Sequence, residues 1–328
     1  MTPTPGDVHV NTPLTNMSIA YLQNATNFAA TQVFPNIPVA KQSDRYYTYD
    51  RGQFNRDEMQ ERAPSTESFG GGYTVDNTPT YYCHVYAFHK DIDDQMRANA
   101  DAVLNPDREA MTYVTHKALI KREKVFVNTF FKTGVWGREL TGVASGAAGT
   151  NILQWNDPAS TPIEGIRAEK TSMMENTGYE PNVLMLGQRV VDALLDHPDI
   201  IDRIKYGQTA GGPAKTTMQI LASLFDVDKI VVSKAIENTA QEGQTNAHAF
   251  IAGKHALLLY APAAPGLMTP SAGYTFSWTG YMGAGAEGNR IKQFRMENLA
   301  SDRVEIEMCF AMKAVGTDLG TFWNGIVA

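Results

Sequence analysis

Apolar residues recur at helical spacing most clearly between Asn105 and Gly134. The residues near one side of this segment are Met111, Val114, Ala118, Val125 and Phe130. Asn105 is a good N-cap, Pro106 suits the first helical turn, and Gly134 is a typical residue after a helix end. The pattern predicts a helix over about 105–133. At about 1.5 Å per residue it would be about 40 Å long, which indicates a structural spine.

Two segments on either side of a polar stretch favour β-strands. SDRYYTYDRGQF (43–54) and PTYYCHVYAFHK (79–90) are rich in Tyr, Phe, Val and Thr, which are common in strands. The polar residues between them include the glycine triplet Gly70–Gly72. We therefore predict a long two-stranded arm over residues 41–90. It needs partners, because isolated hairpins are marginally stable in water.

The first 40 residues lack the pattern of a core element. Prolines at positions 3, 5, 13 and 35 interrupt regular structure, and the rest reads as an extended arm with apolar anchors at Val33, Phe34 and Ile37. Such an arm is seldom stable alone, so we expect it to lie on another surface, often that of a neighbouring subunit.

Strand and helix patterns alternate in the second half of the chain. The segments 181–187, 229–236 and 247–262 predict strands, and 162–178, 188–207 and 218–227 predict helices, with a bend at Pro198. This alternation indicates a mixed α/β domain. Three further strand-like segments follow Tyr274, and 141–162 is expected to be a loop of small residues. The fold class is therefore α+β.

Composition limits the function classes. The 328 residues are 43% hydrophobic and 19% charged, with a formal net charge of −7. An acidic chain is a poor candidate for gripping nucleic acid over a large surface. Cys83 and Cys309 form no CxxC pair, so we expect two small buried apolar residues and neither a zinc site nor a disulfide framework. We find no secretory signal and no apolar run long enough for a membrane span, and expect a soluble protein.

Motifs that could carry chemistry are weak. GAGAEG (283–288) matches GxGxxG formally, but the residues after it predict a strand, whereas a dinucleotide site needs a helix there. GGPAKTT (211–217) has Ala where a phosphate-binding loop has Gly before its Lys. The histidines lack ligand spacing, and Asp91, Asp93 and Asp94 resemble a solvated helix start more than a metal site. We expect no enzyme, no cofactor and no metal.

The order of these elements favours assembly over catalysis, because the arm and the hairpin cannot bury their apolar faces within one chain. The order also resembles the major capsid proteins of tailed bacteriophages. Residues 97–137 resemble their spine region, 62–94 their extension loop, and 181–200 with 229–262 their axial domain. The resemblance covers nearly the whole chain; its single motifs are soft and their order is specific.

The resemblance implies the Hong Kong phage capsid fold. Its parts would be an N-terminal arm at 1–40, an extension loop at 41–90, a peripheral domain at 91–180 with the spine helix, an axial domain at 181–300, and returning strands at 301–328. Subunits of that family form hexamers and pentamers that close into an icosahedral shell around double-stranded DNA. They would be assembled in the host cytoplasm and located in the virion capsid, without a membrane and without sequence-specific DNA binding.

Two departures from the family bear on partners. Some members cross-link through a lysine of the extension loop, yet residues 42–89 contain no Lys, so we expect a non-covalent shell, with room for a decoration protein. Some members carry a cleaved scaffolding segment; the chain begins at Met1, so we expect a separate scaffolding protein, beside a portal. The main rival is an encapsulin-like cellular compartment shell, and a distant rival is a nucleotide-binding enzyme.

The extension loop holds the candidate interface residues, some of them aromatic, some charged and three of them glycine. They are Tyr47, Tyr49, Arg51, Phe54, Arg62, Phe69, Gly70, Gly71, Gly72 and Tyr73. Arg51, Arg56 and Arg62 with nearby acids would offer intersubunit ion pairs; ordinary solvated charges are the alternative. The glycine triplet lacks the strand-to-helix context of a phosphate cradle. We interpret it as the flexible end of the loop.

Overall fold

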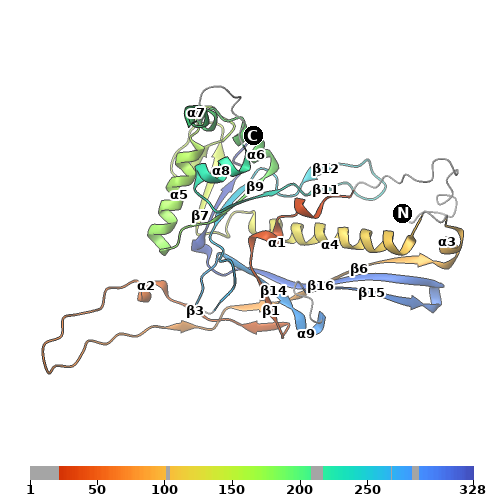
Figure 1. The fold of residues 1–328 in the computed structure, drawn as a ribbon, viewed down its shortest axis with the longest axis horizontal. Coiled ribbons are helices and arrows are strands. Elements are labelled where there is room, and N and C mark those ends of the chain that lie inside the picture. Colours follow the sequence, from red (N-terminus) through yellow and green to blue (C-terminus); the bar gives the residue numbers. More distant parts are fainter. Residues whose placement is uncertain (1–21, 101–103, 208–216, 267, 283–287) are drawn as a thin grey trace.

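The computed structural model describes residues 22–100, 104–207, 217–266, 268–282 and 288–328. Two main β-sheets organise these residues (Figure 1). One sheet lies along a long helix, the other is accompanied by shorter helices, and an extended loop projects from the body at the end opposite the tips of β15 and α3.

The first sheet is built around the long strand β16 (Ser301–Ala314). Antiparallel partners of β16 are β6 (His84–Asp93), β14 (Gly273–Trp278) and β15 (Asn289–Met296), and β1 (Asn36–Val39) pairs parallel with β14. Alternate residues of β16 enter one core cluster: Val304, Ile306, Met308, Phe310 and Met312. This is the two-residue period of a strand with one face covered. The strands predicted after Tyr274 are therefore present.

Helix α4 (Pro106–Phe130) covers that face of the sheet. Asn105 is its N-cap and its Oδ1 accepts the Arg108 N–H at 3.1 Å, as predicted. The helix ends four residues before Gly134, with Phe131 as C-cap. Its buried apolar side consists of Ala110, Val114, Ala118, Phe126, Val127 and Phe130. Two residues of the predicted stripe are not buried: Met111 is 39% exposed and Val125 is half-buried.

The second sheet contains six strands in the order β10-β9-β13-β17-β7-β8. Their bounds are β7 Arg138–Val143, β8 Asn151–Leu153, β9 Val183–Gly187, β10 Lys229–Ser233, β13 Ala256–Leu259 and β17 Gly320–Asn324. Its helices are α5 Pro162–Thr177, α6 Gln188–Leu195, α7 Pro198–Gly207 and α8 Met218–Phe225. Gly178 ends α5 in the left-handed conformation, as predicted. The helix predicted over 188–207 with a bend at Pro198 is two helices, because α6 ends at Leu195 and Pro198 begins α7. The predicted loop 141–162 is partly wrong, since β7 and β8 occupy part of it.

Smaller elements complete the described chain. They are η3 Ala25–Asn27, α1 Ala30–Val33, β2 Ser43–Arg45, β3 Thr48–Tyr49, α2 Arg51–Phe54, β4 Val75–Asp76, β5 Thr80–Tyr82, α3 Asp94–Asn99, β11 Ile236–Asn238, β12 His248–Phe250, α9 Thr279–Met282, η4 Glu297–Leu299 and η5 Thr317–Leu319. The strands β11 and β12 form a hairpin that lies beside α4 in Figure 1.

Strand pairing divides the chain differently from the predicted ranges. β14 and β15 fall within 181–300 but pair with β16 in the first sheet. β7 falls within 91–180 but pairs with β17 in the second sheet, and β6 extends past residue 90 as a strand of the first. The physical reason is that hydrogen bonding between segments remote in sequence selects sheet partners, whereas the local residue pattern gives only the strand itself.

The described part of the N-terminal arm packs on its own chain. Val33 and Phe34 are buried, and the ring of Phe34 lies edge-on to Phe126 at 5.1 Å and to Phe130 at 4.9 Å. Ile37 is partly buried in β1. The expectation that the arm cannot bury its apolar residues within one chain is therefore wrong for residues 28–39.

A buried carboxylate fastens this segment. Glu123 of α4 is fully buried and its Oε2 accepts the N–H groups of Ala29 at 2.9 Å and Ala30 at 2.8 Å. Its Oε1 accepts the hydroxyl of Ser233, at the end of β10, at 2.6 Å. Burial raises the pKa of Glu123, and the three hydrogen bonds offset part of that effect. One side chain thus joins the arm, the long helix and the second sheet.

Candidate subunit interface

The extension loop has a short paired stem instead of a long two-stranded arm. β2 pairs with β5 and β3 with β4, and residues 55–74 between them form no strand. Tyr46 and Tyr81 stack on Phe276 of the first sheet, with ring centroids 5.9 and 4.6 Å away. Residues 79–90 were predicted to form one strand of the arm, but from His84 onward they pair with β16 in the first sheet. The loop with its stem therefore spans residues 43–82, and the last residues of the predicted range 41–90 belong to the first sheet.

Aromatic residues gather where the paired stem ends. The rings of Tyr49, Phe54 and Tyr73 have centroids 5.3 to 6.0 Å apart. They remain 38%, 49% and 61% exposed. Exposed aromatic rings that cluster on a projecting element are typical of surfaces that another protein covers.

The loop turns back at Ala63–Thr66. The Thr66 N–H donates to the Ala63 carbonyl at 3.3 Å, Pro64 occupies the second position, and Ser65 has a positive φ of 64°. This is the pattern of a type II β-turn, in which Gly or Asn is the usual third residue. The Arg62 side chain donates to the Thr66 carbonyl and braces the turn.

The glycine triplet lies on the returning limb and not at the turn. A Cβ on Gly70 or Gly72 would meet nothing within 4 Å, and one on Gly71 would lie 2.4 Å from the Glu58 carboxylate. All three are exposed, and none has a positive φ. The interpretation of the triplet as the end of the loop is therefore wrong in position.

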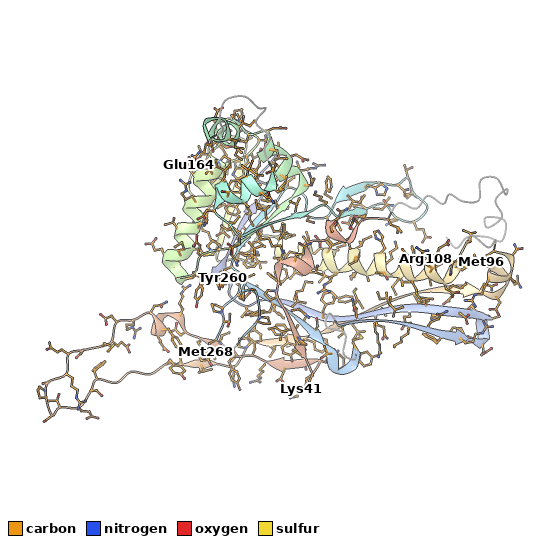
Figure 2. The ribbon with its side chains drawn as sticks, in the orientation of Figure 1. Lys41, Met96, Arg108, Glu164, Tyr260 and Met268 are labelled. Atoms are coloured by element: carbon orange, nitrogen blue, oxygen red, sulfur yellow. The ribbon has the colours of Figure 1, made fainter. Side chains whose placement is uncertain are left out.

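The loop arginines have partners within the chain. Arg51 pairs with Asp318 at 3.1 Å, which ties the stem to η5, and Arg56 pairs with Glu58 at 3.3 Å. Tyr47 and Phe69, 69% and 62% exposed, extend from the loop without a described neighbour ring. Figure 2 shows the side chains of the outer loop projecting on both sides of a single extended trace.

A second exposed apolar surface was missed by the sequence reasoning. Between β6 and α4 lies a groove of about 440 Å³ whose lining is Val85, Tyr86, Ala87, Phe88, Lys117, Ala118, Lys121, Ile306 and Met308. We call it the β6–α4 groove. Phe88 on its wall is 40% exposed. Tyr113 of α4 is 42% exposed, and the centroids of the two rings lie 5.8 Å apart. The available signal was Tyr113, an aromatic residue of the helix that lies outside the predicted stripe.

The described residues offer no developed catalytic or metal site. His197 Nε2 lies 3.0 Å from the Ser160 hydroxyl, but the Asp199 N–H donates to Nδ1 at 3.2 Å. The ring proton is therefore on Nε2, and this histidine cannot accept the serine proton as a base would. Asp91 pairs with Arg303, and Asp93 caps α3. No group of three metal-binding side chains occurs in the part of the chain that the structure describes.

The two glycine motifs fall mostly outside the described residues. GGPAKTT is placed only at Thr217, which caps α8, and GAGAEG only at Gly288. The residues after Gly288 form β15, as predicted, so no helix follows this motif. Both cysteines are fully buried and free, as predicted, and burial raises the pKa of Cys83 to about 12 and of Cys309 to about 11. Among the described helices, none is long and apolar enough to cross a membrane.

Comparison with known proteins gives a consistent answer. No protein-family model matches the chain. The chain is 28% identical over 323 residues to the major capsid protein of Pseudomonas phage JBD67, covering 97% of each. A phage-related protein from Bordetella bronchiseptica matches with a TM-score of 0.67 and 20% identity, covering 92% of this chain and 93% of that one. The capsid of cyanophage P-SCSP1u matches with a TM-score of 0.62 and 12% identity over 99% and 98%.

The chain is similar to phage major capsid proteins. It has the fold of phage capsid proteins that the sequence resemblance implied, and the long helix predicted from the sequence is α4. An encapsulin from Synechococcus elongatus also shares the fold, with a TM-score of 0.56 and 11% identity over 94% of this chain and 92% of that one. The fold alone therefore fits both a phage capsid and a cellular compartment, whereas the full-length sequence relative is a phage capsid protein.

Proposed function

We propose that the chain is the structural subunit of an icosahedral phage capsid that encloses double-stranded DNA. Copies would form hexamers and pentamers, without catalysis and without a cofactor. The observation that carries this proposal is the identity of 28% to a phage major capsid protein over 97% of both chains. The projecting loop with exposed aromatic residues supports it, because a lone subunit gains nothing from such a surface.

The candidate interface residues belong to this proposal. Tyr47, Tyr49, Phe54, Phe69 and Tyr73 would lose exposed apolar area against a neighbouring subunit, which favours association. Arg62 would hold the turn, and Gly70–Gly72, of which Gly70 and Gly72 have open space around them, would let the returning limb adapt.

The charged pairs near the stem have a different role. Arg51 already pairs with Asp318 of its own chain, so its role would be to orient the loop and not to pair across subunits.

Electron microscopy of the purified protein tests the proposal. Capsomers, tubes or closed shells are the expected result, with a separate scaffolding protein added where closed shells need one. Only monomers at high concentration, with and without co-expressed phage assembly genes, would contradict it. A gel of boiled particles is expected to show monomers alone, since residues 42–89 lack a lysine for cross-linking.

The rival function is a compartment shell that encloses a cargo enzyme, which the encapsulin match favours. The two functions differ in content. Particles from infected or induced cells are expected to contain DNA that resists nuclease, together with portal and scaffold or decoration proteins, after assembly in the host cytoplasm. A co-purifying enzyme and no DNA would favour the compartment.

A further inference from the structure

The lysines beside the β6–α4 groove carry positive charge that no carboxylate neutralises. Lys90 of β6 and Lys117 and Lys121 of α4 form no ion pair with any residue that the structure describes. The Nζ atom of Lys121 lies 5.0 Å from the centroid of the Tyr86 ring. The Nζ atoms of Lys117 and Lys90 lie 5.4 and 6.0 Å from the centroid of the Tyr113 ring. The rings hold the ammonium groups in place, so their charge is available to an anionic ligand.

The opposite face of the first sheet is neutralised by its own residues. The residues of β16 that alternate with the core-facing ones point away from α4. On that face Arg303 pairs with Asp91 at 2.7 Å, and Arg290 pairs with Glu307 at 2.7 Å. In the part of the sheet that the structure describes, a cluster of unpaired cations is therefore found on the α4 side and not on the opposite face.

A positive row continues along the exposed side of α4. Residues that recur every three or four positions share one side of a helix, and on this side they are Tyr113, Lys117, Lys121, Lys124 and Asn128. Between residues 110 and 130 the helix has one carboxylate, Glu123, which is buried. The chain as a whole has a net charge of −7. The row is therefore a local exception of the kind that contacts nucleic acid.

We propose that Lys90, Lys117 and Lys121 contact the phosphates of the enclosed double-stranded DNA. Each strand of DNA presents one phosphate per about 3.4 Å of its axis, so a row of lysines meets phosphates in any register. Such contacts carry no base sequence information. Tyr113, which is 42% exposed, adds a hydroxyl that can donate to a phosphate oxygen. The patch is small, in keeping with an acidic chain, but every copy in a shell repeats it.

This inference rests on the proposed function, because it needs a shell that encloses DNA. It adds the surface by which each subunit would meet that DNA. An acidic protein segment is the other kind of partner that three lysines could attract, and the experiments below separate the two.

Lysine acetylation of assembled particles tests the contact directly. Mature particles filled with DNA are compared with mature particles whose DNA has been released, so that the protein contacts of the shell are the same in both. Mass spectrometry follows the labelling of each lysine. We expect Lys117 and Lys121 to react at least about fivefold more slowly in the filled particles, because phosphates cover their ammonium groups. Lys254 and Lys313, which lie away from the groove, should react equally in both.

Equal labelling of Lys117 and Lys121 in the two preparations overturns the inference and leaves the proposed function intact. Fast labelling in both would show that the lysines face solvent, and slow labelling in both would show that another protein surface covers them. Particles that never contain DNA would overturn the proposed function and this inference with it.

Binding of a duplex oligonucleotide to the unassembled protein at low salt gives a second measurement. Three phosphate contacts predict a slope of about −2.7 for the logarithm of the binding constant against that of the salt concentration. Lys117→Gln with Lys121→Gln leaves one contact and predicts a slope of about −0.9, whatever the base sequence. Lys254→Gln with Lys313→Gln should leave the slope unchanged, and thermal unfolding should be the same in all variants.

An unchanged slope in the Lys117→Gln and Lys121→Gln variant contradicts the proposal. So does a polyglutamate peptide that binds through these two lysines when the duplex does not, because the surface would then serve an acidic protein segment.

Discussion

Removal of the Glu123 carboxylate should loosen the joint between arm, spine helix and second sheet. Glu123→Ala leaves three buried donors without their acceptor: the N–H groups of Ala29 and Ala30 and the hydroxyl of Ser233. An unsatisfied buried donor costs about 1–3 kcal/mol. The sum predicts a loss of about 3 kcal/mol or more in the free energy of unfolding, before any contribution from the cavity.

Glu123→Gln is the matched variant, because the amide keeps an acceptor for the two N–H groups while Ser233 can accept from its NH₂. Burial raises the pKa of Glu123 in the folded protein above its ordinary value of 4.5. The folded state then binds the proton more tightly than the unfolded state, so this group favours folding increasingly as the pH falls through the folded pKa toward 4.5. Glu123→Gln should remove that part of the pH dependence and lower stability far less than Glu123→Ala.

Urea unfolding of the unassembled subunit, followed by tryptophan fluorescence, measures both effects, since Trp136, Trp155 and Trp323 are buried reporters. Glu109→Ala, at an exposed position of the same helix, should stay within about 0.5 kcal/mol of the original protein. The reasoning fails if Glu123→Ala also stays within about 1 kcal/mol, or if Glu123→Gln is as damaging as Glu123→Ala.

Three further predictions concern other parts of the structure. Phe34→Ala should lower the free energy of unfolding by about 3–5 kcal/mol, because it empties a fully enclosed aromatic site, and a loss under 1 kcal/mol in urea unfolding would contradict its role as an anchor. Cys83 and Cys309 have pKa values of about 12 and 11, so they should resist iodoacetamide at pH 8 in the folded protein and react fully in urea. Mass spectrometry measures the labelling, and rapid labelling of the folded protein would refute their burial. The hydrogen bond with Arg303 lowers the pKa of Asp91 below 3.8, so Arg303→Gln should raise that pKa. The stability that Asp91 contributes is present above pH 3.8 and is lost as the pH falls through the folded pKa of Asp91. An NMR titration of the Asp91 carboxyl group that shows no shift in the variant would count against the pairing.

Local signals explain what the sequence allowed us to predict. The N-cap at Asn105, the proline after it and the glycine at 178 act within one helical turn, so the start of α4 and the end of α5 could be placed closely. Strands with a buried period, such as β9 and β16, were visible for the same reason.

Contacts between remote segments explain the rest. The residues near His84 do not predict that the chain leaves the loop stem there and that His84 pairs with Phe310. The residues near Gly273 do not predict that this glycine makes room for the ring of Phe34. A Cβ at position 273 would lie 2.4 Å from that ring. The groove beside Lys117 likewise depends on β6 and β16 meeting α4, and the sequence pattern marks only the half of it that lies on the helix.

The place of β17 has a consequence for how the protein is made. This strand lies between β13 and β7 in the middle of the second sheet. Until the ribosome has added Gly320–Asn324, β7 and β13 have no partner between them, so the sheet closes only after β17 has been made. A chain that stops before Gly320 therefore lacks the strand that joins the two parts of this sheet.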